Sequence, residues 1–455
     1  MVDLVFFTLW FSYACALGWV LYRFRREPLY DPRILFTISA SMWLLILHGY
    51  LIDFEGYLAA KPGFYSTDIR VLAAIALGMM LIGYVVFIVG ASLGTRFAVR
   101  SAPAVFREYK LLTLVCVFLI VIAVLNFSAN VVLISGGNVI QYLAEFAMRP
   151  YQVADNKGIT ASGYLLGFIG IQVIAFLVGR RGVSRPVMLA FLAAVFVMVV
   201  IRFSQARIFQ TLVLMGGCFV SYAMAVALRE GRHTAWIKQI HYLILAGALG
   251  ISIYFLRLAS SLSSLGVQIT WQTVADFNDR IIHFALHRGN VPNFPIVFTI
   301  VDKMPSEESF FLGKTLFNWA VFFVPRSILE ADYLISLRIK KMWYMDVEGG
   351  GLPPTAIGEW YANFGFAGVV LGMFVVGLAI GTLYKYARVS ESPYLVVLWA
   401  NFVFGFVVIY PKTDLAQIPV YTIFLLLCLW LLMKALQSGT RSLAEQYNRS
   451  DVGQR

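Results

Sequence analysis

Long apolar stretches alternate with short polar segments along most of this 455-residue chain. Eleven of them have roughly 15 to 24 residues and are apolar on all sides, which is typical of membrane-spanning helices and not of barrel strands. The pattern therefore predicts an all-α, polytopic integral membrane protein with about 11 transmembrane helices, within a range of roughly 10 to 13. The expected spans are residues 4–22, 34–51, 71–93, 111–134, 162–179, 186–201, 208–228, 242–256, 361–383, 394–409 and 419–433.

The alternation stops once, between the eighth and ninth expected spans, where a polar segment of roughly a hundred residues intervenes. We therefore divide the chain into residues 1–256 with helices 1 to 8, residues 257–360 as one large loop, residues 361–436 with helices 9 to 11, and a polar tail at 437–455. The loop contains short apolar runs that favour short or re-entrant helices. A run of Gly349, Gly350, Gly351, Leu352, Pro353 and Pro354 interrupts any helix near its end.

Composition supports a membrane location, because hydrophobic residues make up 60% of the chain and charged residues only 13%. The net charge of +12 does not indicate nucleic acid here, because the basic residues are concentrated on alternate loops. One set of loops holds 20 of the 36 lysines and arginines, and the short connections between them hold seven. The positive-inside rule then places the N-terminus and the large loop outside and the C-terminus in the cytoplasm. The basic inner face favours contact with anionic membrane lipid. The basic loops are 23–33, 94–110, 180–185, 229–241, 384–393 and the tail from Lys434.

The first apolar stretch follows only Met1, Val2 and Asp3, without a basic region, so we expect it to remain in the mature protein. The four cysteines all fall within expected spans and have no paired spacing. We therefore expect neither a disulfide framework nor a cysteine-based metal site.

Three stretches resemble the O-antigen polymerase family, the Wzy-type oligosaccharide repeat-unit polymerases of bacterial envelopes. The first is Phe-Phe-Val-Pro-Arg at 322–326, which closes an apolar outer segment. The second is Pro-Pro-Thr-Ala-Ile-Gly-Glu-Trp-Tyr-Ala-Asn-Phe-Gly at 353–365, which leads into an expected span. The third is the pair Arg202 and Arg207 between two spans. The sequence departs from the family after Arg326, where it continues Ser-Ile-Leu-Glu-Ala.

The resemblance implies a GT-C-like membrane body and a glycosyltransferase that needs neither a metal nor another cofactor. Such an enzyme joins undecaprenyl-pyrophosphate-linked oligosaccharides, as donor and acceptor, on the periplasmic face of the bacterial inner membrane. A polysaccharide chain-length regulator is the partner that the resemblance implies. The donor already contains an activated sugar pyrophosphate bond, so the protein must stabilise the departing pyrophosphate and orient or deprotonate the acceptor hydroxyl.

Arginines at the outer ends of the expected spans are candidates for binding the pyrophosphate, because a guanidinium fork matches phosphate oxygens and stays charged. A single arginine at such a position also fits simple snorkelling toward the interface. The outer short loops are otherwise poor in basic residues, which favours the binding role for the set as a whole. The candidates are Arg202, Arg207, Arg257, Arg280 and Arg326, together with Arg149, which follows from the resemblance.

For the catalytic base the candidates are Glu359, Asp276 and His283. Glu359 lies just before an expected span, where partial desolvation would poise its carboxyl group for proton transfer. The alternative is a favourable charge at a helix N-terminus. His283 and His287 are one helical turn apart, but the residues between them do not fit a zinc site, so we expect no metal there.

Trp319, Trp360 and Tyr361 are candidates for stacking on sugar rings. Aromatic residues at this depth commonly form the interfacial belt of a membrane protein instead. Both interpretations remain open from the sequence.

Two other functions compete with the polymerase. A related O-antigen ligase would transfer the finished glycan to lipid A core, so the acceptor distinguishes the two enzymes. A lipid-linked oligosaccharide flippase or other transporter would place ionisable residues in mid-membrane, whereas the centres of the expected spans are nearly free of charge.

Overall fold

The computed structural model consists of helices joined by turns and loops, with no strand among the residues it describes. Four helices in this part of the chain are long and apolar enough to cross a membrane, which indicates a multi-pass membrane protein. The chain divides into two compact units. The described residues are 1–51, 65–97, 109–138, 142, 161–204, 208–239, 294–316, 335–343, 352–389, 392–403, 405, 407, 410–412 and 426–434.

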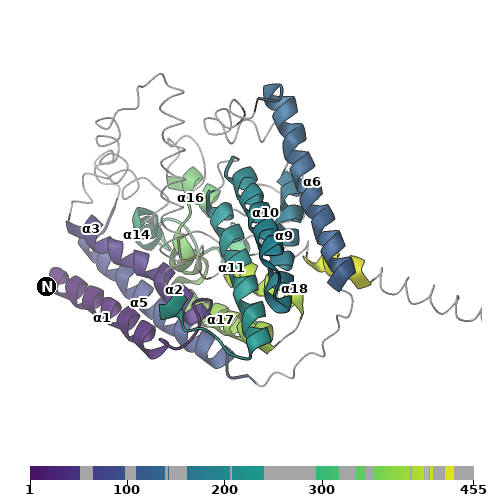
Figure 1. The fold of residues 1–455 in the computed structure, drawn as a ribbon. Helices are drawn as coiled ribbons and strands as arrows, with labels where there is room; N and C mark the ends of the chain where they lie inside the picture. Colours follow the sequence, from purple (N-terminus) through teal and green to yellow (C-terminus); the bar gives the residue numbers. More distant parts are fainter. Residues whose placement is uncertain are drawn as a thin grey trace, which may run out of the picture. The chain divides into compact units, whose positions relative to one another are not determined.

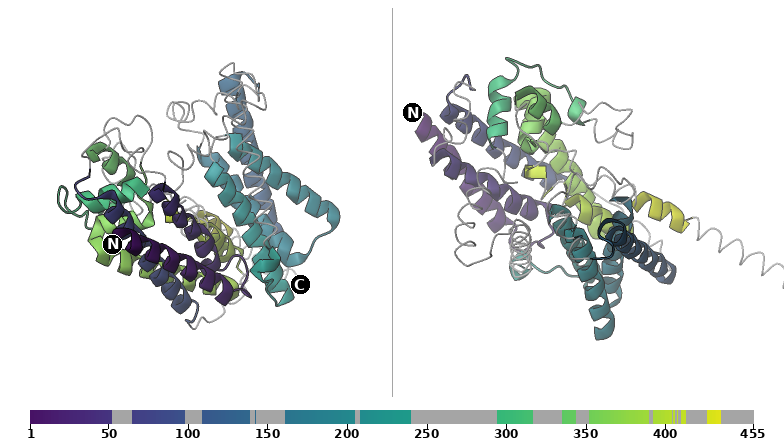
Figure 2. Two further views of the ribbon diagram at one scale, coloured as in Figure 1. Left: turned by 90° about the vertical axis from the view of Figure 1, so that its left-hand side faces the viewer. Right: turned by 90° about the horizontal axis from the view of Figure 1, so that it is seen from above.

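The first unit is built on three helices that run in the same direction (Figure 1 and Figure 2). They are α1 (Val2–Arg23), α5 (Ile69–Gly94) and α17 (Thr355–Val389). Between α1 and α5 the chain returns along these helices through α2 (Pro32–Ala40), the 3-10 helix η1 (Ser41–Leu45) and α3 (Ile46–Leu51). Short helices complete the unit: α14 (Phe294–Lys303), α16 (Ile335–Trp343) and η4 (Tyr410–Lys412).

Helices α5 and α17 pack backbone to backbone because glycines line both sides of their contact. A Cβ atom on Gly90 or Gly94 of α5 would collide with the main chain of α17, and one on Gly377 or Gly381 of α17 would collide with that of α5. Each pair has the Gly-x-x-x-Gly spacing that lets membrane helices approach closely. This contact fixes the relative position of the two helices that lead to the candidate site.

The two ends of this helix group differ, and we name each after one residue. At the Asp302 end, where α1, α5 and α17 begin, Asp3 of α1 forms an ion pair of 3.8 Å with Arg70 of α5, and α14 lies against both α5 and α17. At the Arg33 end, where the three helices terminate, Arg388 of α17 lies 3.4 Å from Glu27. Since α5 has 26 residues, the ends are separated by about 39 Å.

The second unit contains α6 (Tyr109–Ser135), α9 (Ala161–Arg181), α10 (Arg185–Ser204) and α11 (Ile208–Glu230), and most of α18 (Pro393–Phe402). Helix α9 is central in this unit and packs on α6, α10 and α11. Its buried Gln172 exchanges two amide hydrogen bonds with buried Asn401, of 2.5 and 3.5 Å. Paired amides satisfy each other where water is excluded.

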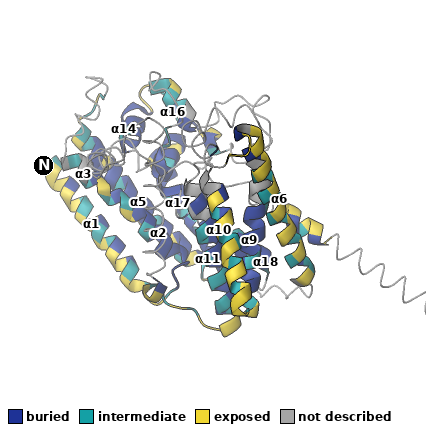
Figure 3. Cartoon of the chain, turned by 45° about the horizontal axis from the view of Figure 1, so that its top comes forward, coloured by how far each residue is buried: buried dark blue, intermediate teal, exposed yellow. Residues whose placement is uncertain are grey.

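Apolar side chains remain exposed along several long helices (Figure 3). In α6, Leu114, Phe118 and Leu125 each have more than 60% of their surface exposed. In helix α9, in contrast, residues 166–179 are almost entirely buried. Exposed apolar faces of this extent on membrane-length helices fit contact with lipid chains rather than with water.

Most predicted spans agree closely with the observed helices where the structure describes them, but span 361–383 is six residues shorter than α17 (Thr355–Val389) at each end. Predicted spans 71–93 and 208–228, for example, correspond to α5 (Ile69–Gly94) and α11 (Ile208–Glu230). Span 34–51 is helical but changes type at η1, and the eighth span, 242–256, lies outside the described residues. The all-α class is therefore confirmed for the described residues, whereas the number of crossings stays a prediction.

Candidate functional site

The segment 353–365 makes a turn at Thr355 and continues as the first, short part of helix α17, at the Asp302 end. Thr355 has φ 67°, a left-handed backbone that is rare for a β-branched residue. Its Oγ1 accepts a hydrogen bond from the N–H of Gly358 at 3.4 Å. A Cβ on Gly358 would lie 3.0 Å from Pro354 and 3.4 Å from Val297 of α14, so only glycine allows this close approach without adjustment. Strained backbone of this kind is retained where the surrounding structure determines it.

Asn363 connects this turn to the segment that follows α14. Its Oδ1 accepts the N–H of Gly313 at 2.9 Å, and its Nδ2 donates to Thr315 Oγ1 at 2.6 Å and to the carbonyl of Glu359 at 2.8 Å. Two further backbone bonds, of 2.9 and 3.0 Å, run from Phe311 and Leu312 to the carbonyls of residues 362 and 363. We call Gly313, Thr315, Glu359 and Asn363 the Asn363 clasp. Because Asn363 is fully buried, the clasp holds both segments in one arrangement.

Helix α17 is interrupted directly after the clasp. Phe364 (φ −141°, ψ 18°) and Gly365 (φ 62°, ψ −152°) leave helical geometry, and the second of these conformations is accessible essentially only to glycine. The indole of Trp360 consequently lies on Gly372 and stacks on Phe364 with ring centroids 6.4 Å apart. The part of α17 before Phe364 is thus folded back onto the long apolar part of the same helix.

Glu359 lies in the middle of this segment and is 1% exposed. A carboxyl group in such a position costs free energy that an apolar side chain would not, so its presence calls for a specific role. The clasp fixes the Glu359 main chain through the bond from Asn363. An acceptor molecule reaches its side chain only if the surrounding side chains move.

A second buried carboxyl group, Asp302, joins α14 to the start of α5. It accepts hydrogen bonds from Ser66 N at 2.9 Å, Ser66 Oγ at 2.8 Å and Thr67 N at 2.9 Å. Burial by itself raises the pKa of Asp302, but the bonds from Ser66 and Thr67 outweigh it and lower the pKa below its ordinary value of 3.8. The group is therefore a stable carboxylate that fixes the chain, and not a proton carrier near neutral pH.

Charged side chains surround a small apolar core at this end. Arg338 of α16 donates to Glu308 at 3.4 Å and lies 4.3 Å from the ring centre of Phe311. Lys303 donates to Glu307 at 2.7 Å. The core beneath them joins α14, α16 and the clasp segment through Ile296, Ile300, Met304, Phe311, Ile335, Ile339 and Ala362.

The two described aromatic candidates are engaged in internal packing. The Trp360 ring covers Gly372, as noted above, and Tyr361 is half-buried against the same apolar core, with its ring edge-to-face to Phe310 at 6.0 Å. Their role in sugar binding stays a prediction.

Most other predicted site residues lie outside the described residues. Arg202 lies in the last turn of α10, although its side chain is not described. The catalytic candidates Asp276 and His283 fall outside the described residues, as do Trp319 and the arginines Arg149, Arg207, Arg257, Arg280 and Arg326. Whether these groups meet Glu359 therefore stays a prediction.

Sequence reasoning identified Glu359 but missed Asn363 and Asp302, which build much of the rest of this site. Asn363 stands four residues after Glu359 within the recognised motif, and this helical spacing was a usable signal. Asp302 contacts residues more than 230 positions earlier, and no local pattern indicates such a contact. Among the described residues, no group of three histidine, cysteine, aspartate or glutamate side chains is placed to hold a metal ion.

We compared the chain with family models, curated proteins and solved structures. No family model matches the chain, and no curated protein and no solved structure matches it either.

Proposed function

We propose that this protein is a periplasmic-face glycosyltransferase that joins undecaprenyl-pyrophosphate-linked oligosaccharide repeat units of a bacterial envelope polysaccharide. The observation that carries the proposal is the buried carboxyl group of Glu359, held near the start of a membrane-length helix in the segment 353–365 that resembles the polymerase family. The distribution of basic residues supports assigning the Asp302 end to the periplasm and the Arg33 end to the cytoplasm.

In the proposed reaction the bond between the anomeric carbon of the donor and its pyrophosphate oxygen breaks. Undecaprenyl pyrophosphate leaves with that electron pair, and an acceptor hydroxyl oxygen forms the new glycosidic bond. The acceptor proton passes to a base, for which we propose Glu359, exposed by movement of the side chains that cover it. The six predicted arginines would stabilise the charge on the leaving pyrophosphate.

The test uses the purified full chain in liposomes with a synthetic undecaprenyl-pyrophosphate-linked repeat unit and no nucleotide. We expect a glycan ladder from the wild type. Glu359→Gln keeps the size of the side chain and removes its basicity, so it should slow the reaction by about 10²- to 10⁴-fold. Glu307→Gln is the matched control, since its side chain is 52% exposed and should leave the ladder unchanged.

Three results would count against the proposal. A normal ladder from Glu359→Gln would remove this residue from the chemistry. Transfer only to lipid A core would identify a ligase. Lack of any glycan product, with movement of the lipid-linked substrate across the liposome membrane, would identify a transporter.

A further inference from the structure

The Arg33 end contains a cavity of about 790 Å³ within the first unit. Its wall comes from the last turns of α1, the following loop, the start of α2 and the residues around the end of α5. Cavities of this volume accommodate small molecules or headgroups. The lining residues are Trp19, Tyr22, Arg23, Phe24, Arg25, Arg26, Glu27, Arg33, Ser92, Thr95 and Arg96.

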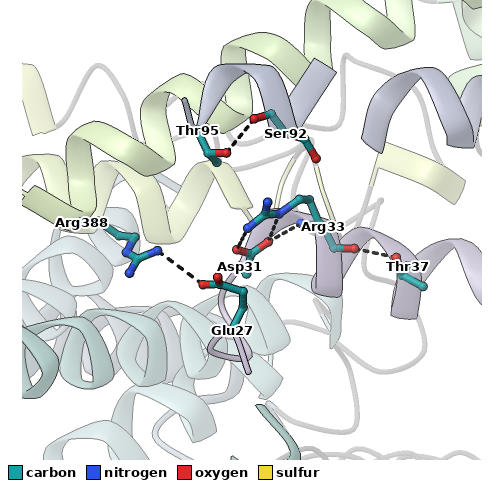
Figure 4. Close-up of polar contacts among 7 residues, drawn as sticks. All are labelled: Glu27, Asp31, Arg33, Thr37, Ser92, Thr95 and Arg388. Carbon is teal, nitrogen blue, oxygen red and sulfur yellow. Dashed lines mark hydrogen bonds and ion pairs between the residues drawn. The ribbon is translucent and has the colours of Figure 1, made fainter. Parts of the chain in front are cut away.

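Five arginines and a single acidic residue line this cavity. Glu27 is engaged by Arg388 at 3.4 Å, and Arg33 is neutralised by Asp31, to which it donates two hydrogen bonds of 2.8 and 2.6 Å (Figure 4). The remaining four arginines, Arg23, Arg25, Arg26 and Arg96, form no ion pair with a described acidic residue. The cavity therefore has a surplus of positive charge that the described part of the chain does not balance.

Aromatic side chains place the cavity at the border of the apolar zone. Trp19 and Tyr22 are 60% and 66% exposed near the end of the apolar helix α1. The guanidinium of Arg25 lies 4.2 Å from the ring centre of Tyr22, and that of Arg33 lies 3.9 Å from the ring centre of Phe24. Exposed tryptophan and tyrosine beside arginines at a helix end are typical of the lipid headgroup region.

We infer that this cavity binds the phosphate-bearing headgroup of an anionic phospholipid from the adjoining leaflet. Arginine forks bind phosphate oxygens bidentately, and basic pockets between membrane helices on the cytoplasmic side bind anionic headgroups. The acyl chains would lie along the exposed apolar face of α1, where Phe11 is 66% exposed. The cavity shares no lining residue with the Asn363 clasp. Ile357, beside the clasp, packs against Gly83, which precedes the end of α5 at Gly94 by about 17 Å of helix, so the cavity is distinct from the proposed reaction centre.

The test measures lipid binding to the full chain in a neutral detergent by native mass spectrometry. The probes are phosphatidylglycerol, cardiolipin and phosphatidylcholine. We expect the two anionic lipids to bind, and the double variant Arg26→Gln/Arg96→Gln to weaken their binding about tenfold, since each arginine near anionic lipid adds several-fold. The control, Lys238→Gln/Lys385→Gln, removes the same charge at the same end from residues that do not line the cavity, and should change binding less than twofold.

Equal losses in both double variants would overturn the inference, because they would reflect net charge alone. Equal binding of phosphatidylcholine would do the same. Inorganic pyrophosphate that binds in the absence of lipid and displaces phosphatidylglycerol would identify a soluble phosphate compound as the ligand instead.

If the glutamine variant fails to fold, Arg26→Lys/Arg96→Lys retains the charge and removes the forks. It should give an intermediate loss of anionic lipid binding, and wild-type binding by this variant would contradict the inference. Since the measurement involves no glycan substrate, its outcome is independent of the polymerase assay.

Discussion

The two ends of the first unit hold buried carboxylates in opposite ways. At the Asp302 end, Asp302 receives hydrogen bonds from neutral donors, namely two backbone N–H groups and a serine hydroxyl. At the Arg33 end, Asp31 receives two bonds from the Arg33 guanidinium and one from the N–H of Arg33, which it caps at the start of α2. The neutral donors hold the chain at Asp302 without neutralising its carboxylate, whereas the Arg33 guanidinium also neutralises the negative charge of Asp31.

The space around these carboxylates differs as well. In the described part of the chain, the Asp302 end contains an apolar core and the Asn363 clasp. The Arg33 end is open, with a cavity of about 790 Å³. A backbone held by buried hydrogen bonds suits the precise positioning of a reacting group, and a cationic cavity suits a ligand that brings its own negative charge. The same three helices thus support two kinds of site.

The largest effect is expected when the ion pair of the Arg33 end is broken. Asp31→Asn leaves the Arg33 guanidinium buried without its counter-charge, and should lower the free energy of unfolding by about 3–5 kcal/mol. Thermal denaturation of the purified protein in detergent would measure the loss.

Two controls sharpen this result. Asp31→Asn/Arg33→Met removes both charges and should recover a large part of the stability. Glu27→Gln breaks the half-exposed pair with Arg388 and should cost less than about 1 kcal/mol. Similar losses from Asp31→Asn and Glu27→Gln would show that burial does not distinguish the two pairs.

At the Asp302 end, breaking the Asn363 clasp should have the next largest effect. Asn363→Ala leaves the N–H of Gly313 and the carbonyl of Glu359 without this partner, at a cost of about 2–3 kcal/mol. Thermal denaturation is again the measurement. Thr315→Val removes one hydrogen bond only and should cost about 1 kcal/mol. If the two variants cost the same, Asn363 would not be the centre of the clasp.

The positions of the long helices were predictable from the sequence, because a long apolar run forms a buried or membrane helix and has few alternative structures. The prediction of a helix at 71–93 therefore came within two residues of α5 (Ile69–Gly94) at each end. The interruption at Phe364 and Gly365 was missed, because the predicted span 361–383 begins before it. An isolated glycine near a helix end is consistent with both a continuous and a broken helix.

The polar contacts of the candidate site were not predictable in the same way. Ser66 and Asp302 are 236 positions apart, and the choice of partner depends on how α5 and α14 pack. The glycines at 90, 94, 377 and 381 did contain a signal for the contact between α5 and α17, since their spacing is typical of close helix pairs. Spacing within one helix indicates that it has a close partner, but it does not say which helix that partner is.

The smallest expected effect is the pH dependence of stability. It distinguishes Asp302, which is held by neutral donors, from Asp31, which is held in an ion pair. Hydrogen bonds from Ser66 and Thr67 hold the pKa of Asp302 below 3.8, so the unfolded chain takes up this proton first as the pH falls. The resulting stability is fully present above about pH 4 and is lost as the pH falls through the lower, folded-state pKa.

Asp302→Asn should therefore cost about 1 kcal/mol at pH 7, and the difference from wild type should shrink toward pH 3. Thermal denaturation across this range measures it, with Asp68→Asn as the control because asparagine caps α5 as well as aspartate does. A difference that stays constant between pH 7 and pH 3 would mean that the shape of the Asp302 side chain, and not its charge, holds the start of α5 to α14.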